Sequence, residues 1–164
     1  MNLPNREPCE ENQFLANHVA RLLASLRYWT GHDLVDPQLP MVEQARQLFA
    51  APFVLLSHDT AADPMLNYGN RTGMRLFELS WQELIATPSR LTAEPVHRDE
   101  RARLLDAVSR NGFIDDYRGV RVSKTGRRFL IEKAIVWNLI DENGAPYGKA
   151  ATFSAWKYLD TERK

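Results

Sequence analysis

The stretch RFLIEKAIVWNLI, residues 128–140, followed by DENG at 141–144, decides the fold. Successive side chains of a strand point to opposite faces, and the stretch alternates in the way that this geometry requires. The residues expected to share one face are Phe129, Ile131, Ile135, Trp137 and Leu139. DENG is a strong hairpin-turn sequence, so residues 147–156 should return as an antiparallel strand.

Working outward, three further segments complete a sheet. Residues 113–123 end in an alternation that puts Val120 and Val122 on one face, and residues 124–126 make the turn into the long strand. Short apolar runs at 53–57 and 65–68 predict two more strands. Five antiparallel strands with interspersed short helices predict an α+β fold.

Short helices are expected between the second and third strands. Asn70 is placed to cap a helix that starts at residue 71, and Ser80 with Glu83 forms a capping box for the next. A longer helix spans about 97–111 and ends at Gly112.

The N-terminal third reads as a helical extension. Residues 14–29 carry apolar residues at alternating spacings of four and three, and a second short helix spans about 41–50. This narrow seam could pack on its own domain or pair with a second copy of the chain. Its members, taken as candidate interface residues, are Leu15, Val19, Leu22, Leu26 and Trp29. We therefore divide the chain into a flexible tail (1–13), a helical extension (14–51) and a sheet domain (52–159).

Composition narrows the class of protein. The 21 basic and 21 acidic residues balance, and no block of like charge suits direct contact with nucleic acid. No run of about 18 apolar residues occurs, so we expect no membrane span. The single cysteine, Cys9, allows neither an internal disulfide nor a CxxC motif, which favours a cytoplasmic protein.

Several clusters of residues resemble the PAS fold, in which short helices cover one face of a five-stranded antiparallel sheet. More narrowly, residues 52–156 resemble the MEKHLA family, a PAS-like domain of stand-alone bacterial proteins and of plant class III homeodomain-leucine zipper proteins. The stretches that carry this resemblance are SH at 57–58, DP at 63–64, NYGN at 67–70, PSRL at 88–91, GFI at 112–114, YRGVR at 117–121, GRRF at 126–129 and VWN at 136–138. The resemblance implies regulation rather than a named activity.

PAS-like domains commonly hold a flavin, a haem or a metabolite between sheet and helices, and the identity of any cofactor here stays unknown. Ser89 stands where the light-sensing flavin subfamily carries its reactive cysteine, and a serine cannot form that adduct. His97 lies near the position of a haem ligand, but a helix-start histidine facing water is the expected alternative. The histidines lack the spacing of a metal site.

Six residues are candidate ligand-binding residues: three polar residues stand among apolar neighbours on the central strands, three come from adjoining elements, and a buried polar group needs a partner. They are Asn67, Tyr68, Arg90, Arg121, Glu132 and Asn138. The alternative is structural: Glu132 would pair with Arg121 or Arg128, and Asn138 would satisfy a backbone turn. Trp137 and Trp156 are candidates for a docking face of the sheet.

These observations predict a non-catalytic, stand-alone sensory or regulatory module that binds a small ligand, a protein partner or both. The partner would be a second copy or a separate signalling protein. The alternative is a ligand-free module for dimerisation and protein interaction. Nucleophile-elbow, P-loop and Rossmann motifs are missing from the sequence, so an enzyme is unsupported.

Overall fold

The computed structural model describes residues 6–159 and contains one antiparallel sheet in the order β2-β1-β5-β4-β3. The strands are β1 (Val54–His58), β2 (Leu66–Gly69), β3 (Phe113–Val122), β4 (Arg128–Ile140), β5 (Pro146–Phe153) and β6 (Ala155–Tyr158). β6 continues β5 past Ser154 and pairs with the first part of β4. The expected third strand of the meander is thus split in two, and the five-stranded α+β fold is confirmed.

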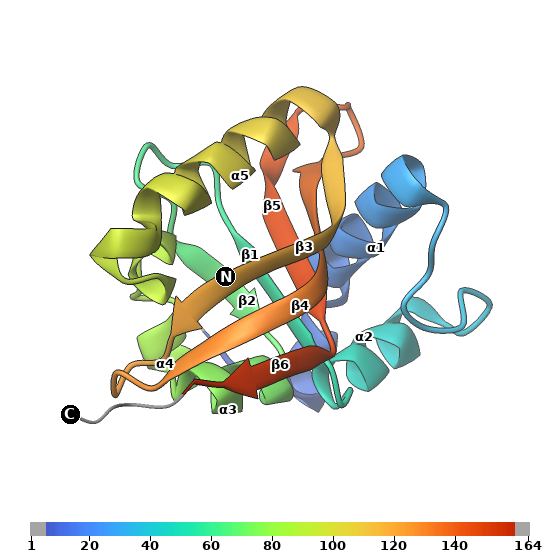
Figure 1. Ribbon diagram of the computed structural model, residues 1–164. Coiled ribbons are helices and arrows are strands. Elements are labelled where there is room, and N and C mark those ends of the chain that lie inside the picture. The colour runs from blue at the N-terminus through green and yellow to red at the C-terminus, as the bar shows by residue number, and fades with distance from the viewer. Residues whose placement is uncertain (1–5, 160–164) are drawn as a thin grey trace.

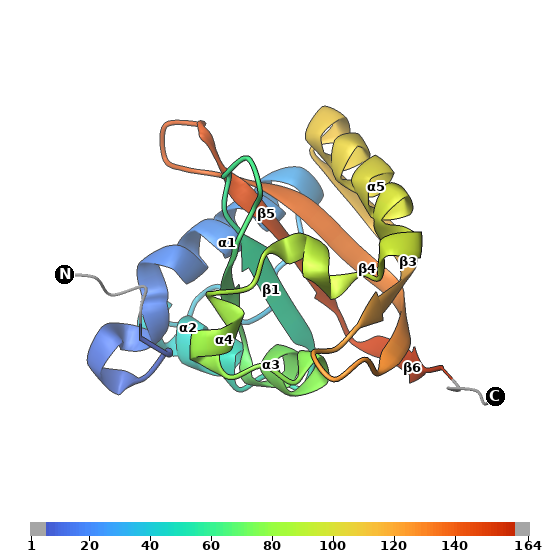
Figure 2. The same ribbon diagram turned by 90° about the vertical axis from the view of Figure 1, so that its left-hand side faces the viewer.

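Helices lie on both sides of the sheet. The sheet separates α1 (Ala16–Thr30) from α5 (Arg98–Asn111), as Figure 2 shows. The other elements are α2 (Met41–Phe49), α3 (Arg71–Phe77), α4 (Trp81–Leu84) and the 3-10 turns η2 (Glu10–Leu15), η3 (Ser89–Thr92) and η4 (Pro95–His97). In Figure 1 α5 runs along the top of the view, α3 and α4 lie at the lower left, and α1 lies at the right. Within residues 6–159 no helix is both long and apolar enough to cross a membrane.

The helix starts follow the local sequence. The Asn70 side-chain oxygen accepts a hydrogen bond from the backbone N–H of Gly73 at 3.0 Å and caps α3. The Asn70 amide also donates to the carbonyls of Leu48 and Phe53, at 3.0 and 2.8 Å, so this fully buried residue joins α2, β1 and α3. The capping box of Ser80 and Glu83 is present at the start of α4. Both caps expected from the sequence are confirmed.

Two bulges bend the β3-β4 ribbon and change which side chains share a face. Between Ile114 and Tyr117 β3 has an extra residue, and β4 has one opposite Arg118, where Lys133 adopts a left-handed φ of 57°. Beyond a bulge, side chains exchange faces. Phe129 and Ile131 therefore share the inner face with Ala134 and Val136, whereas Ile135, Trp137 and Leu139 lie on the face covered by α1. The prediction of one continuous face was wrong for this reason.

The outer face of the sheet is covered by the chain's own first helix. Val19, Leu22 and Leu26 are fully buried, and the fully buried Trp137 donates from its indole N–H to the Leu22 carbonyl at 3.1 Å. Trp29 lies over Gly112 and donates to the Asn138 carbonyl at 3.0 Å. The interface assignment is therefore corrected: Val19, Leu22, Leu26 and Trp137 belong to the core of their own chain, and the partly buried Leu15 and Trp29 pack against that core. Trp156 is only partly buried, and its docking role stays a prediction.

The expected tail also contains regular structure. Residues 1–5 lie outside the described residues. The 3-10 turn η2 begins at Glu10, and Phe14 is buried against the ring of Phe49. Arg46 of α2 forms an ion pair with Glu10. The α1 and α2 segment and the sheet share one hydrophobic core.

Candidate functional site

A cavity of about 80 Å³ lies between the inner face of the sheet and the α5 side of the domain. Its apolar wall comes mainly from Leu56, Phe77, Leu104, Ile131 and Val136. Its polar wall comes from the side chains of His58, Ser89, Thr92, Arg101, Tyr117, Arg121 and Lys149. The two bulges of the β3-β4 ribbon help to form this wall, because Tyr117 begins the stretch of β3 between them.

Arg121 projects from β3 into the buried interior, with only 7% of its surface exposed. Its guanidinium donates to the Val120 carbonyl at 2.8 Å and to the Tyr117 hydroxyl at 3.2 Å, and it lies 5.5 Å from the Tyr117 ring centroid. The Tyr117 hydroxyl in turn donates to the Glu100 carboxylate at 2.8 Å. Gly119 makes this arrangement possible, because a Cβ there would lie 2.2 Å from the Tyr117 oxygen.

Arg101 reaches the cavity from the first half of α5. Its guanidinium donates to the Ser89 hydroxyl at 2.6 Å, and Ser89 is itself buried in η3. Burial, and then the nearby charge of Arg121, lower the pKa of Arg101 to about 10. Arg101 remains charged at neutral pH, so two guanidinium groups face one cavity.

His58, at the end of β1, brings an unpaired acceptor to the same cavity. Its Nδ1 lies 2.9 Å from the Asp59 carbonyl, which can only accept, so Nδ1 carries the proton in the neutral ring. Nε2 is then a bare acceptor, and it is buried without a partner among the described residues. Burial lowers the pKa of His58, and the charges of Arg101 and Lys149 lower it further.

The cavity thus has an unbalanced charge. Three cations line it, Arg101, Arg121 and Lys149, but no carboxylate does. Among residues 6–159 none of the three forms an ion pair. Burial lowers the pKa of Lys149, so its charge is also poorly solvated. Such a site favours an anion, because a buried charge is stable only when it is paired.

The size of the cavity limits what it can hold. Pockets for drug-sized ligands occupy roughly 300 to 1,000 Å³. A cavity of about 80 Å³ does not accommodate a flavin or a haem unless the covering helices move. His97 is not among the lining residues, and the described residues contain no cluster of three or more His, Cys, Asp or Glu side chains suited to a metal ion.

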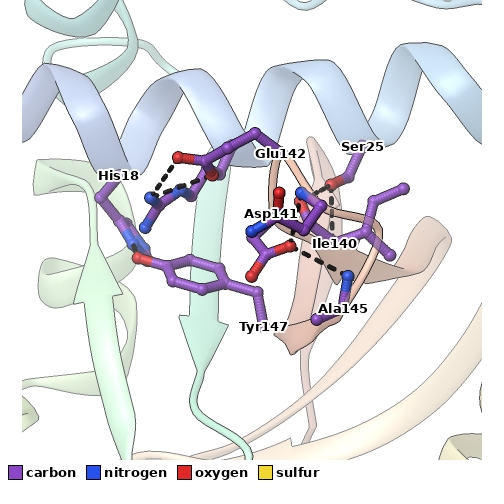
Figure 3. Close-up of polar contacts among 9 residues, drawn as sticks. His18, Ser25, Ile140, Asp141, Glu142, Ala145 and Tyr147 are labelled. Atoms are coloured by element: carbon purple, nitrogen blue, oxygen red, sulfur yellow. Dashed lines mark hydrogen bonds and ion pairs between the residues drawn. The ribbon is translucent and has the colours of Figure 1, made fainter.

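A second polar cluster lies on the opposite face, beneath α1. The Ser57 hydroxyl donates to the Asn67 side-chain oxygen at 2.6 Å, so it accepts from His18 Nε2 at 2.9 Å. His18 Nδ1 then accepts from the Tyr147 hydroxyl at 2.8 Å, the contact seen in Figure 3. Burial, and then the charge of Arg21, lower the pKa of His18 to about 4.

This cluster is one of several polar contacts that join α1 to the β4-β5 hairpin (Figure 3). The Ser25 hydroxyl accepts from the Ile140 backbone N–H at 2.9 Å, and Arg21 pairs with Glu142 in the turn at 3.1 Å. The Asp141 carboxylate holds that turn by accepting from the Ala145 backbone N–H at 2.9 Å. These contacts tie the helix directly to the hairpin.

The six predicted ligand-binding residues do not converge. Only Arg121 lines the inner cavity. Asn67 belongs to the His18 cluster, and Arg90 pairs with Asp63 on the surface at 3.2 Å. Glu132 pairs with Arg118 at 3.6 Å, because the bulge sets these two side chains together, and not with Arg121 or Arg128.

Tyr68 and Asn138 have other surroundings. Tyr68 is fully buried between the rings of His18 and Trp81, its hydroxyl has no partner among the described residues, and burial raises its pKa. The Asn138 amide donates to the Val108 carbonyl at 2.9 Å near the end of α5. Asn138 thus has a structural contact, but with the end of a helix and not with the expected turn.

The sequence reasoning missed His58, Arg101, Tyr117 and Lys149 as cavity residues. The signal for Arg101 was its position one turn before Leu104 on the inward face of α5. On β3 the apolar alternation of Val120 and Val122 drew attention to the less buried face. Charged residues on a strand are ordinarily expected to face solvent, and here that expectation misleads.

Comparison with known proteins identifies the family to which this chain belongs. The MEKHLA domain pattern matches residues 16–158. The homeobox-leucine zipper protein HOX32 of Oryza sativa subsp. indica is 23% identical over 154 residues, which are 91% of this chain and 17% of that protein. The chain thus spans about a sixth of the length of this relative.

Among solved structures, the PAS domain of a protein from Colwellia psychrerythraea has a TM-score of 0.60 at 15% identity, over 71% of this chain and 94% of that one. An RNA-binding light-oxygen-voltage receptor has a TM-score of 0.60 at 18% identity, over 80% of this chain and 36% of that one. A light-oxygen-voltage domain studied with a flavin analogue has a TM-score of 0.56 at 13% identity, over 73% and 86%. These likenesses establish the fold.

Proposed function

Because the chain belongs to the MEKHLA domain family and has a PAS-like fold, we propose that it is a non-catalytic sensory module whose inner cavity binds a small molecule. The fold itself is that of signalling modules. Ligand binding would be converted into a change in a contact with a second copy of the chain or with a separate signalling protein.

The observation that carries the proposal is the set of unsatisfied polar groups around the cavity. Buried polar groups in folded proteins almost always have hydrogen-bonding partners. Here the His58 Nε2 has none among the described residues, and the guanidinium groups of Arg101 and Arg121 lack a counter-ion. A bound molecule would supply these partners.

The route of a signal is short. Ser57 and His58 are neighbours on β1, and their side chains lie on opposite faces of the sheet. His58 faces the cavity, whereas Ser57 accepts the hydrogen bond from His18 of α1. A ligand that shifts β1 at His58 would therefore change the seating of α1, and a ligand can shift such an equilibrium only by its difference in affinity for the two states.

The test is native mass spectrometry of protein purified without added cofactors, together with a denatured sample and an absorption spectrum. We expect extra mass that leaves on denaturation, without visible absorbance, since the cavity is too small for flavin or haem. A bare chain, combined with an empty result from analysis of small molecules extracted from the same preparation, would contradict the proposal.

A second candidate function is a ligand-free module for dimerisation and protein interaction. The small volume of the cavity, about 80 Å³, favours it, because a nearly filled interior needs no ligand. The same mass spectra discriminate between the two functions: a bare dimer supports the second, and a ligand-bearing chain supports the first.

A further inference from the structure

The polar wall of the inner cavity defines the chemical class of its ligand, an inference that rests on the ligand-binding function proposed above. We propose that the cavity binds a small hydroxycarboxylate. Arg101 and Arg121 hold its carboxylate, its hydroxyl donates to His58 Nε2, and its short hydrocarbon body packs against the apolar wall.

The charge of the cavity requires an anion. Arg121 is 7% exposed, yet its described partners are the neutral Val120 carbonyl and Tyr117 hydroxyl. The described hydrogen bond of Arg101 is to the neutral Ser89 hydroxyl. Glu100 is the carboxylate joined to this network by hydrogen bonds, and it accepts from the Tyr117 hydroxyl, whereas Asp63 acts on Arg101 without a described ion pair between them. A carboxylate accepts two hydrogen bonds from the planar, forked donors of a guanidinium, as a phosphate also does, and the largely apolar wall favours the carboxylate because it brings a hydrocarbon body.

His58 adds a requirement that a simple carboxylate does not meet. Its Nδ1–H is used by the Asp59 carbonyl, so the neutral ring offers only an acceptor at Nε2. The ring stays neutral because it is buried beside Arg101 and Lys149. An acceptor needs a donor, which a hydroxyl supplies and a carboxylate lacks.

The volume sets the size. A cavity needs about 10 to 15 Å³ of such volume to hold one water molecule, which is about the size of one non-hydrogen atom of a ligand with its hydrogens. The cavity of about 80 Å³ therefore holds about five to eight non-hydrogen atoms. Short hydroxy acids, such as 3-hydroxybutyrate with about seven non-hydrogen atoms, are of this size.

The test compares three probes on the wild-type protein: 3-hydroxybutyrate, butyrate and 3-hydroxybutyramide. Binding is followed by NMR titration, including the side-chain N–H signals of arginine. We expect saturable binding of 3-hydroxybutyrate, with butyrate about tenfold weaker for lack of the hydroxyl and the amide at least about tenfold weaker for lack of the charge. Since these comparisons use one unmodified protein, they do not depend on the folding of a variant.

Two variants add a matched control. Arg121→Gln should weaken 3-hydroxybutyrate by about tenfold or more. Arg118→Gln on the same strand, which removes only an exposed pair with Glu132, should leave the affinity unchanged.

The outcomes that overturn the inference differ from those that overturn the proposed function. Equal binding of the amide overturns the carboxylate assignment, and equal binding of butyrate overturns the role of His58. No saturable binding of any probe at millimolar concentration overturns the inference as a whole. In each of these cases a ligand detected by native mass spectrometry leaves the proposed function standing.

Discussion

Lowering the pH should weaken the seam between α1 and the sheet through His18. In the folded chain Nε2 donates to Ser57 and Nδ1 accepts from Tyr147, so the neutral ring is satisfied on both sides. The pKa of His18 falls from an ordinary 6.5 to about 4 because of burial. Below about pH 6.5 the unfolded chain therefore takes up a proton that the folded chain refuses, and stability falls with pH until about pH 4.

The magnitude follows from the two pKa values. Between about pH 7.5 and about pH 5 the difference corresponds to a loss of about 2 kcal/mol in the free energy of unfolding. Part of the His18 surface is accessible, so we expect solvent screening to leave about 1 kcal/mol. That is a measurable share of the stability of a small domain.

The assay is urea unfolding of wild type, His18→Gln and His32→Gln at the two pH values. Glutamine does not titrate, so the loss on acidification should be about 1 kcal/mol smaller in His18→Gln than in wild type. His32 is exposed, and its variant should follow wild type. His58 is present in all three chains, so its own protonation cancels. An identical loss in wild type and His18→Gln would refute the reasoning.

Three other substitutions test the packing by urea unfolding. Leu22→Glu places a charge at a fully buried site and should lower the free energy of unfolding by about 3 kcal/mol or more. A variant that folds with unchanged stability, but whose particle has half the mass of the wild-type particle, would show instead that the apolar seam of α1 pairs two copies of the chain. Gly119→Ala should cost about 1–3 kcal/mol, because its Cβ would displace the Tyr117 hydroxyl; no change in stability would contradict that close approach. Ser80→Ala removes the cap of α4 and should cost about 1 kcal/mol, whereas a neutral result would mean that the α4 end is held by other contacts.

The fold was largely predictable because its signals are local. The turn at residues 141–144, the Asn70 cap and the Ser80 capping box each act within a few residues, and each is present. The alternation of β4 predicted a strand correctly but could not reveal the bulge at Lys133. A bulge depends on the partner strand, and one residue of offset exchanges every later side chain between faces.

The candidate site was less predictable because it depends on long-range contacts. Arg121 was predicted as a residue from an element adjoining the central strands, but Arg101 joins it only through the packing of α5 on the sheet. For the apolar stripe of α1 the local pattern was clear, but the surface that it packs against was not. Its spacing was read correctly, yet two heptads do not distinguish an intramolecular face from an intermolecular one, and the buried Trp137 decides between them.

The paired bulges of β3 and β4 also bear on how this sequence can change over generations. The bulge at Lys133 divides β4 into two segments whose inward positions are out of phase. If the bulge flattened into simple alternation with no residue lost, Trp137 would turn toward the cavity and Val136 toward α1. We therefore expect length changes in this domain to accumulate in its turns, because one residue gained or lost in a regular part of β4 would exchange the inward and outward side chains beyond it.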